Sequence, residues 1–323
     1  MAPQDILFTR CASNSSAGLF TSGKGARGTP LTREDLLAEF RSHMVLGEKR
    51  PLTALVSVSD RIVDTLSRAL SKCRKGESAD QIWIAFIGVP NSETSIYHHA
   101  EVLAEELEER NPGRFRHEYV FEWIIPEGYI LHQVSLQTLI NRGFNIGRYI
   151  NDDTATLKQN IAMDYLYPPE DGYGIGLSLG PMARCFGARA PQREIIDRII
   201  HECSYVLSVS HMGHYARVRY GSRDGPEHTV DFGYFCDQER GIDQALEWWL
   251  ADSELCLDLK RHNEWVNDME YYMEQEWSHY CIDVYEDAGS GLNPVFVTRR
   301  QEIEKRHEDI RAEIELAATE LGL

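Results

Sequence analysis

Four polar residues in the first half of the chain stand where predicted strands end, and their types could do chemistry. Arg10 follows a short apolar run, Ser57 and Ser59 close a β-branched run, and Glu122 precedes the stretch Trp-Ile-Ile-Pro. A guanidinium offers a planar pair of donors to an anion. Hydroxyl groups donate and accept hydrogen bonds, and a carboxylate can stabilise positive charge. Together these residue types indicate a site for a small polar ligand.

The elements that must position these residues are predicted from periodicity and capping. Alternating and β-branched runs predict strands, and apolar residues at helical spacing after Thr32 and Asp60 predict two helices. The strand 117–125 and the strand 129–134 are expected to be antiparallel neighbours joined by the turn Pro126-Glu-Gly. Short strands, hairpins and single helices predict an α+β fold rather than a doubly wound one. The remaining expected elements of this half are strands at 6–9, 53–59 and 81–88 and helices at 97–110 and 136–140.

The second half is predicted to be mixed at first and then mostly helical. Residues 151–191 are rich in Pro and Gly and are interpreted as a linker or a long active-site loop. The predicted domains are therefore 1–150, this segment, and 192–323. The expected elements after the segment are a helix at 192–203, strands at 205–210, 215–220 and 229–235, and helices at 240–251, 254–278 and 295–321.

Composition limits the functional classes. The chain has 33 basic and 51 acidic side chains, a net charge of −18, which disfavours non-specific binding to nucleic acid or anionic lipid. Its seven cysteines include no Cys-x-x-Cys pair and are interpreted as free thiols. No basic apolar leader and no long apolar run is present in the sequence, so we expect a soluble cytoplasmic protein without a membrane partner.

The order Arg10, Ser57-Val-Ser59 and Glu122 resembles the Arg–Ser–Glu site of ADP-ribosyltransferases. The features from Leu7 to Phe144 also resemble an uncharacterised fungal domain family. The resemblance implies a split antiparallel sheet and nicotinamide adenine dinucleotide (NAD) as substrate. It implies that Arg10 holds a phosphate or ribose and that the serines order the nicotinamide side, with Ser57 facing the pocket.

In the same family, the catalytic glutamate stabilises an oxocarbenium-like transition state as nicotinamide leaves. The resemblance gives this role to Glu122 and implies a transferase that cleaves the nicotinamide–ribose bond by transfer or hydrolysis, with the acceptor left open. The sequence departs from the family at Val120, where many members carry a second acid, and at Val58 within the serine element. A catalytically degenerate nucleotide-binding or interaction module is therefore the alternative.

Other motifs support weaker hypotheses. Asp152-Asp153 resembles the Asp-Asp-x-x-Glu motif of fungal arginine-containing cyclodipeptide synthases, but Thr156 replaces its glutamate. A biosynthetic enzyme that uses the aromatic C-terminal helices as its pocket is a further alternative, although core packing explains most of these aromatic residues. His211 and His214 lack a third ligand nearby, so no metal site is predicted. The stretch 172–176 is glycine-rich but lacks the Lys-Ser/Thr of a phosphate loop.

Overall fold

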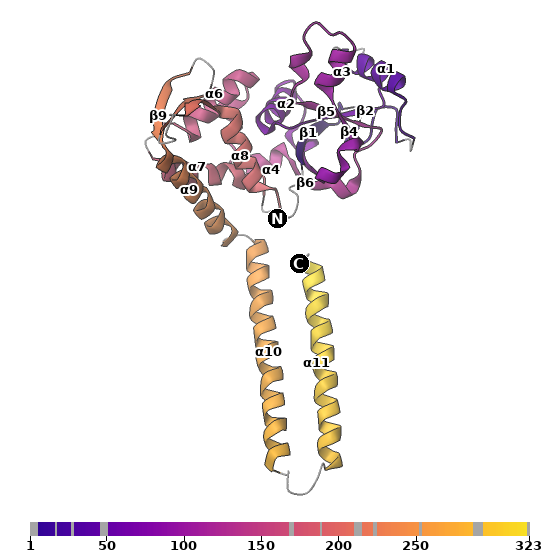
Figure 1. The fold of residues 1–323 in the computed structure, drawn as a ribbon, viewed down its shortest axis with the longest axis vertical. Helices are drawn as coiled ribbons and strands as arrows, with labels where there is room; N and C mark the ends of the chain where they lie inside the picture. The colour runs from indigo at the N-terminus through magenta and orange to yellow at the C-terminus, as the bar shows by residue number, and fades with distance from the viewer. Residues whose placement is uncertain are drawn as a thin grey trace. The chain divides into compact units, whose positions relative to one another are not determined.

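The chain forms two compact units, Met1–Glu247 and Trp248–Leu323, in a computed structural model. Each is described by itself. The structure describes residues 6–16, 18–26, 29–45, 51–167, 171–187, 189–209, 215–221, 225–251, 254–286 and 293–321. The predicted α+β class is confirmed: a six-stranded antiparallel sheet with helices is followed by a helical C-terminal part. Figure 1 shows the elements in chain order.

The large sheet has the strand order β4-β5-β2-β1-β3-β6, and its neighbouring strands pair antiparallel. Its middle strand β1 pairs with β3 over its whole length, from Ile6↔Val89 to Ser13↔Ile82. The strands are β1 (Ile6–Ser13), β2 (Leu55–Ser59), β3 (Ile82–Val89), β4 (Tyr97–His99), β5 (Glu118–Glu122) and β6 (Ile130–Ser135).

Strand alternation explains how the large sheet is covered. On one face, α2 (Ile62–Arg74) buries its apolar side against Ile84 and Phe86. Further along the same face, α1 (Arg33–His43) and α3 (Ala100–Glu106) cover Leu55 and Val120. The opposite face carries a separate apolar cluster, and the partly buried side chains that cover it are mostly aromatic. This cluster consists of Phe8, Val56, Val58, Ile87, Val89, Phe121 and Ile125.

The sheet is open between β1 and β2. These strands are joined by the single register pair Thr9↔Ser59, whereas β2 pairs with β5 along its whole length. Beyond Thr9 the two strands therefore diverge, and Arg10 and Ser57 lie at the start of the gap. This gap, which we call the split, positions the candidate site described below.

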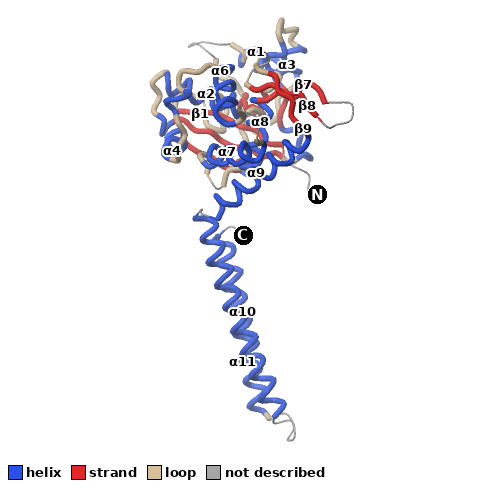
Figure 2. Tube along the Cα trace, turned by 90° about the vertical axis from the view of Figure 1, so that its left-hand side faces the viewer, coloured by secondary structure: helices blue, strands red, loops and turns tan. Residues whose placement is uncertain are grey.

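A second, three-stranded sheet completes the first unit. Its order is β7-β8-β9 (Figure 2). Ala216, Val218 and Tyr220 of its middle strand are buried in the main apolar cluster of this unit. The predicted helix over 192–203 is confirmed as α8. The other elements are α4 (Leu136–Asn141), α5 (Ile146–Tyr149), α6 (Thr154–Tyr165), α7 (Gly172–Arg184), α8 (Gln192–Cys203), β7 (Ser204–Val209), β8 (Tyr215–Tyr220), β9 (Glu227–Asp231) and α9 (Phe232–Ala251).

The interpretation of 151–191 as a linker or loop is wrong for most of its length, because α6 and α7 occupy it. The glycines of α7 allow close helix packing. A Cβ on Gly176 would lie 2.3 Å from the backbone oxygen of Gln238, and one on Gly180 would lie 2.6 Å from the Cβ of Ala245. Glycines four residues apart share one helix face. This face therefore packs directly against the backbone of α9. The glycines serve close helix packing, and the segment is a helix.

Three further predictions are corrected. The strand 129–134 is not the neighbour of 117–125, because β6 pairs with β3 while β5 lies between β2 and β4. The positive φ of 61° at Trp123 ends β5 and turns the chain away from a hairpin. The expected helix over 97–110 begins at Ala100, after strand β4. The expected strand over 229–235 ends at Asp231, where α9 begins.

The second unit is an antiparallel pair of long helices, α10 (Glu254–Glu286) and α11 (Pro294–Leu321), which lie side by side (Figures 1 and 2). Tyr280, Ile303 and Ile310 are buried in their seam. Core packing was predicted to explain most of the aromatic residues here; Tyr280 is buried, whereas Tyr271 and Tyr272 are 60% and 62% exposed. Among the described residues, no helix is long and apolar enough to cross a membrane.

Candidate functional site

A pocket of about 510 Å³ lies at the split between β1 and β2. Arg10 and Cys11 of β1 line it from one side, and Leu55 and Ser57 of β2 line it from the other. Its volume is within the range of small-molecule sites. We call it the split pocket. Its other lining residues are Ser15, Ser16, Gly18, Thr21, Ser22, Gly23, His43, Pro51, Leu52, Thr53 and Lys72.

Arg10 bridges the split. Its Nη1 donates to the backbone oxygen of Ser57, its Nε donates to that of Leu19 at 2.6 Å, and its Nη2 donates to that of Gly18 at 3.0 Å. The guanidinium therefore holds the loop after β1 against β2. The structure brings two of the predicted residues, Arg10 and Ser57, into one pocket and into direct contact.

Ser57 and Ser59 differ in surroundings although they share a strand face. Ser57 is half-buried and lines the split pocket. Ser59 is buried, and its Oγ donates to the backbone oxygen of His117 at 2.9 Å while it accepts from the backbone nitrogen of Arg61 at 3.1 Å. Its hydroxyl is used to shape the turn after β2.

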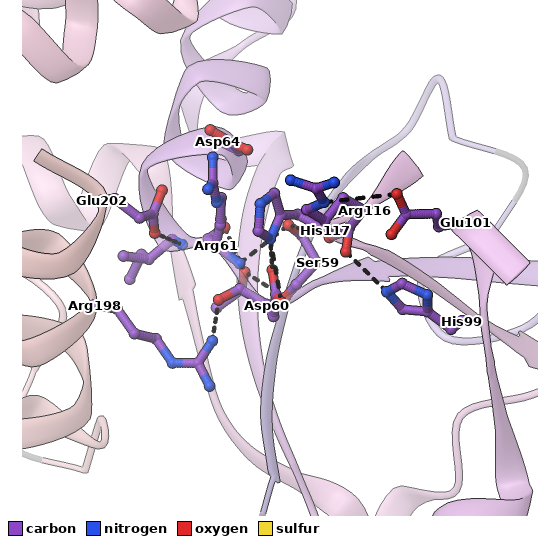
Figure 3. A network of polar contacts seen from close by, with 12 residues as sticks. Ser59, Asp60, Arg61, Asp64, His99, Glu101, Arg116, His117, Arg198 and Glu202 are labelled. Atoms are coloured by element: carbon purple, nitrogen blue, oxygen red, sulfur yellow. Dashed lines mark hydrogen bonds and ion pairs between the residues drawn. The ribbon is translucent and has the colours of Figure 1, made fainter. Parts of the chain in front are cut away.

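That turn belongs to a polar network that joins the sheet to α8 (Figure 3). The Asp60 carboxylate is 3.0 Å from Nδ1 of His117, and Arg198 donates to the backbone oxygens of Asp60 and Leu7. Burial lowers the pKa of His117, while the Asp60 carboxylate opposes that shift. Glu202 accepts from the backbone nitrogens that open α2. The network holds the end of β2 in place and so fixes Ser57 at the split.

A second pocket of about 420 Å³, the side pocket, adjoins the split pocket because Ser57 and His43 line both. The other described residues around it are Met44, Arg68, Arg114, Phe115 and Glu118. The Glu118 carboxylate lies 4.0 Å from His43 and 4.0 Å from Arg68. The register pair Ser59↔Glu118 places this carboxylate on the same sheet face as Ser57. An acid therefore lines the side pocket together with Ser57.

Glu122 is placed differently. It pairs in register with Leu55 of β2, but it does not line either pocket. Its Oε1 is 2.8 Å from Nε2 of His98, and its Oε2 accepts from the backbone nitrogen of Leu31 at 2.7 Å. The carboxylate therefore fastens β4 and the chain before α1 to the end of β5.

The split pocket is electropositive in a strongly acidic protein. Among its described lining residues, Arg10 and Lys72 are basic and none is Asp or Glu. Lys72 donates to the hydroxyls of Ser13 and Ser15 at 2.8 and 3.0 Å and lies 3.6 Å from the Glu77 carboxylate. Hydroxyl donors, the Arg10 guanidinium and the Lys72 ammonium group together suit an anionic ligand.

The thiol in the split pocket is not activated. Burial raises the pKa of Cys11 to about 11, against the opposing effects of nearby Lys72, Arg68 and Arg10. The thiol is therefore protonated at neutral pH, and a thiolate nucleophile is not available there.

Sequence reasoning missed Glu118, His43, Arg68 and Lys72. The strand Glu118–Glu122 carries an acid at each end on the same face, so periodicity could not choose between them. Lys72 lies on α2, and His43 and Arg68 on α1 and α2. Helical residues reach the site only because the helices pack against the sheet. The local sequence around these residues does not indicate that packing.

A metal site is not supported by the described part of the chain, which holds no group of three or more His, Cys, Asp or Glu suited to an ion. His211 and His214 lie outside the described residues. Six cysteines in the described part are free thiols, of which Cys185 and Cys203 are buried.

Residues 9–139 match a family model described as Domain of unknown function (DUF7587). The match begins within β1 and contains β2 to β6, so it includes the strand residues of both pockets. A search of curated proteins found no match. Among solved structures, a chain named EcPltA is 16% identical, with 42% of this chain and 77% of that chain covered and a TM-score of 0.27. At that TM-score the likeness carries no functional argument.

Proposed function

We propose that the first unit binds NAD in the split and side pockets and cleaves the bond between nicotinamide and ribose. The observation that carries the proposal is the placement of Arg10, Ser57 and Glu118 around two adjoining pockets. In this proposal Glu118, rather than Glu122, supplies the reacting carboxylate.

The two pockets suit the two chemical parts of such a ligand. Arg10, Lys72 and the hydroxyl groups of the split pocket match a pyrophosphate and a ribose. The side pocket offers Phe115 as a flat apolar surface beside Met44, which suits an aromatic ring. A ligand that occupies both pockets would pass Ser57, since this residue lines each of them.

Glu118 would act on the charge that develops at the ribose. As the bond between the anomeric carbon and the pyridinium nitrogen breaks, its electron pair leaves with neutral nicotinamide and the ribose becomes cationic. A nearby carboxylate stabilises that cation. Water or an acceptor nucleophile then bonds to the anomeric carbon and releases one proton.

A binding module without catalysis is the second candidate, and Arg10 favours it. Three backbone oxygens already accept from its guanidinium, so part of its donor capacity serves the fold. Val120 also stands where many transferases of this type carry a second acid. A module of this kind would bind NAD and release no nicotinamide.

Two measurements on the full chain test the proposal. A thermal-shift titration with NAD is expected to raise the melting temperature, since ligand at 100 times its Kd adds about 2.7 kcal/mol to the unfolding free energy. Glu118→Gln is expected to keep NAD binding and to lower nicotinamide release by ~100-fold or more, the scale of one preorganised electrostatic partner.

Glu122→Gln is the matched control, because it makes the same change on the same strand outside both pockets. It should reduce release far less than Glu118→Gln. Absence of any shift with NAD would contradict both candidates. Binding without release in the unmodified chain would leave only the binding module, and a larger loss in Glu122→Gln would return the catalytic role to Glu122.

A further inference from the structure

A further concave site lies far along the chain from the split, at the β7 edge of the three-stranded sheet. This pocket of about 530 Å³, the tyrosine pocket, is bounded by β7 and β8 and by α8 and α9. Tyr205, Tyr220, Tyr234 and Phe235 supply aromatic walls. Val206 pairs in register with the buried Val218, yet it is 58% exposed. The helices thus leave this edge of the inner sheet face open.

Gln238 is the feature of the tyrosine pocket that packing alone does not explain. The residue is only 5% exposed and lines the pocket from α9. Within the described part of the chain, its side-chain amide has no hydrogen-bond partner. The amide atoms are not among the fully enclosed polar atoms that lack a partner, so they reach the space of the pocket. A polar ligand in the pocket would pair with this amide.

Two hydroxyl groups add to the polar lining. The Tyr220 and Tyr234 hydroxyls are 3.1 Å apart and share one hydrogen bond. Burial raises the pKa of Tyr234 and of Tyr220, so both are neutral at physiological pH. One of their two protons lies in the shared bond, which leaves the other available to an acceptor on a ligand.

The charged rim disfavours an anion. Asp197 and Glu239 line the pocket, with side chains 50% and 53% exposed. Both share Arg193 with a third carboxylate, Asp243. One guanidinium, which is itself outside the lining, therefore faces three acids beside the rim, and the described lining adds Arg61 and His201 to Asp197 and Glu239. The balance gives no excess of positive charge for a phosphate or a carboxylate.

We propose that the tyrosine pocket binds an uncharged planar nitrogen heterocycle of the nucleobase or nucleoside class. The aromatic walls stack against a flat ring. The Gln238 carboxamide offers a donor and an acceptor side by side, which matches the adjacent donor and acceptor on the edge of such a ring. This site is separate from the split and side pockets, and its ligand does not depend on the function proposed for them.

Isothermal titration of the full chain with adenosine and with adenosine monophosphate tests the assignment. Adenosine is expected to bind, and the monophosphate is expected to bind more weakly because its charge meets the acidic rim. Gln238→Leu keeps the volume of the side chain and removes its amide. It should weaken adenosine binding at least about tenfold, the loss expected for one two-point amide contact.

Gln133→Leu is the matched control, since Gln133 is exposed on β6 and lies outside the pocket. It should leave adenosine binding unchanged. Tyr205→Ala provides a second variant at a half-exposed position, where folding is less at risk, and it should also weaken adenosine binding about tenfold.

Three results would overturn the assignment: no adenosine binding, equal or tighter binding of the monophosphate, or unchanged binding in both Gln238→Leu and Tyr205→Ala. NAD titration of Gln238→Leu keeps the two sites distinguishable. A variant that loses adenosine and retains the NAD-induced thermal shift separates the tyrosine pocket from the split pocket. If NAD fails to bind the unmodified chain, the adenosine result still decides this inference.

Discussion

At the scale of single residues, Arg10 has two structural roles. It lines the split pocket, and its guanidinium holds the loop after β1 against β2. The three carbonyls that accept from it belong to Ser57 on β2 and to Gly18 and Leu19 in the loop after β1. A lysine ammonium is a compact point charge and cannot reach three separated oxygens in one plane. The shape of the split pocket therefore depends on the fork and not only on its charge.

Arg10→Lys is expected to lower the unfolding free energy by about 1–3 kcal/mol, the scale of hydrogen bonds to a charged group, and to weaken NAD binding. Chemical denaturation and NAD titration measure the two effects. Arg33→Lys is the control, because that side chain is 47% exposed in a surface ion pair with Glu106. It should change stability by less than about 0.5 kcal/mol. Equal effects of both substitutions would contradict the bridging role of Arg10.

Glu202 carries a pH dependence that can be isolated. Burial raises the pKa of its carboxyl from 4.5 to about 7, although the Lys158 ammonium nearby lowers it. The folded state then holds the proton more tightly than the unfolded state. The resulting stabilisation is fully present below about pH 4.5 and is lost as pH rises through about 7.

Glu202→Gln removes this titration and keeps an oxygen that can accept from the first backbone nitrogens of α2. Relative to the variant, the unmodified chain is expected to lose stability between pH 5 and pH 8, by up to roughly 3 kcal/mol. Urea unfolding at several pH values measures it. Glu194→Gln, at an exposed position on the same helix, should show no such difference. If the difference in unfolding free energy between the unmodified chain and Glu202→Gln did not change with pH, the titration of Glu202 would not be coupled to folding.

At the scale of elements, the glycine-rich helix α7 shows how packing overrides composition. Gly172, Gly176 and Gly180 recur every four residues and meet α9 at Tyr234, Gln238 and Ala245. Glycine in a helix costs up to about 1 kcal/mol relative to alanine. The close approach that the missing side chains allow offsets this cost. Composition alone predicts a loop here, because it does not register what lies opposite each glycine.

Gly176→Ala is expected to lower the unfolding free energy by about 1–3 kcal/mol, the usual cost of overpacking. Its new Cβ would meet two backbone atoms of α9, at 2.3 and 2.6 Å, and these cannot rotate away. Gly174→Ala is the control on the same helix, since its Cβ would meet only the Asp171 side chain, which can move. Thermal denaturation should show a loss in the first variant and none in the second. A loss confined to Gly174→Ala would contradict this packing.

At the scale of the whole molecule, two units have separate cores. Ile303 and Ile310 are 8% exposed in the seam between α10 and α11, and no described side chain of this unit belongs to the clusters of the first unit. The helical pair also exposes large apolar side chains such as Val295 and Leu316. Its stability therefore depends on a narrow seam within itself.

Ile303→Ala is expected to destabilise the helical pair by about 2 kcal/mol or more, as a core truncation does. Hydrogen exchange should become faster in α10 and α11 while Met1–Glu247 keeps its protection. Leu316→Ala is the control, since Leu316 is 63% exposed, and it should change exchange little. Equal loss of protection in both units would show one cooperative structure instead of two.

The sequence by itself determined the α+β class, the helix Gln192–Cys203 and the positions of most strands, because periodicity and capping are local properties. Residue type and spacing also predicted Arg10 and Ser57 as site residues. Only the tertiary structure decided which strands pair, and the packing around them placed Glu118 at the side pocket with Ser57 and fastened Glu122 to His98. Two acids on one face of one strand have the same local pattern. Their surroundings come from helices and loops distant in sequence, so only the packed chain distinguishes them.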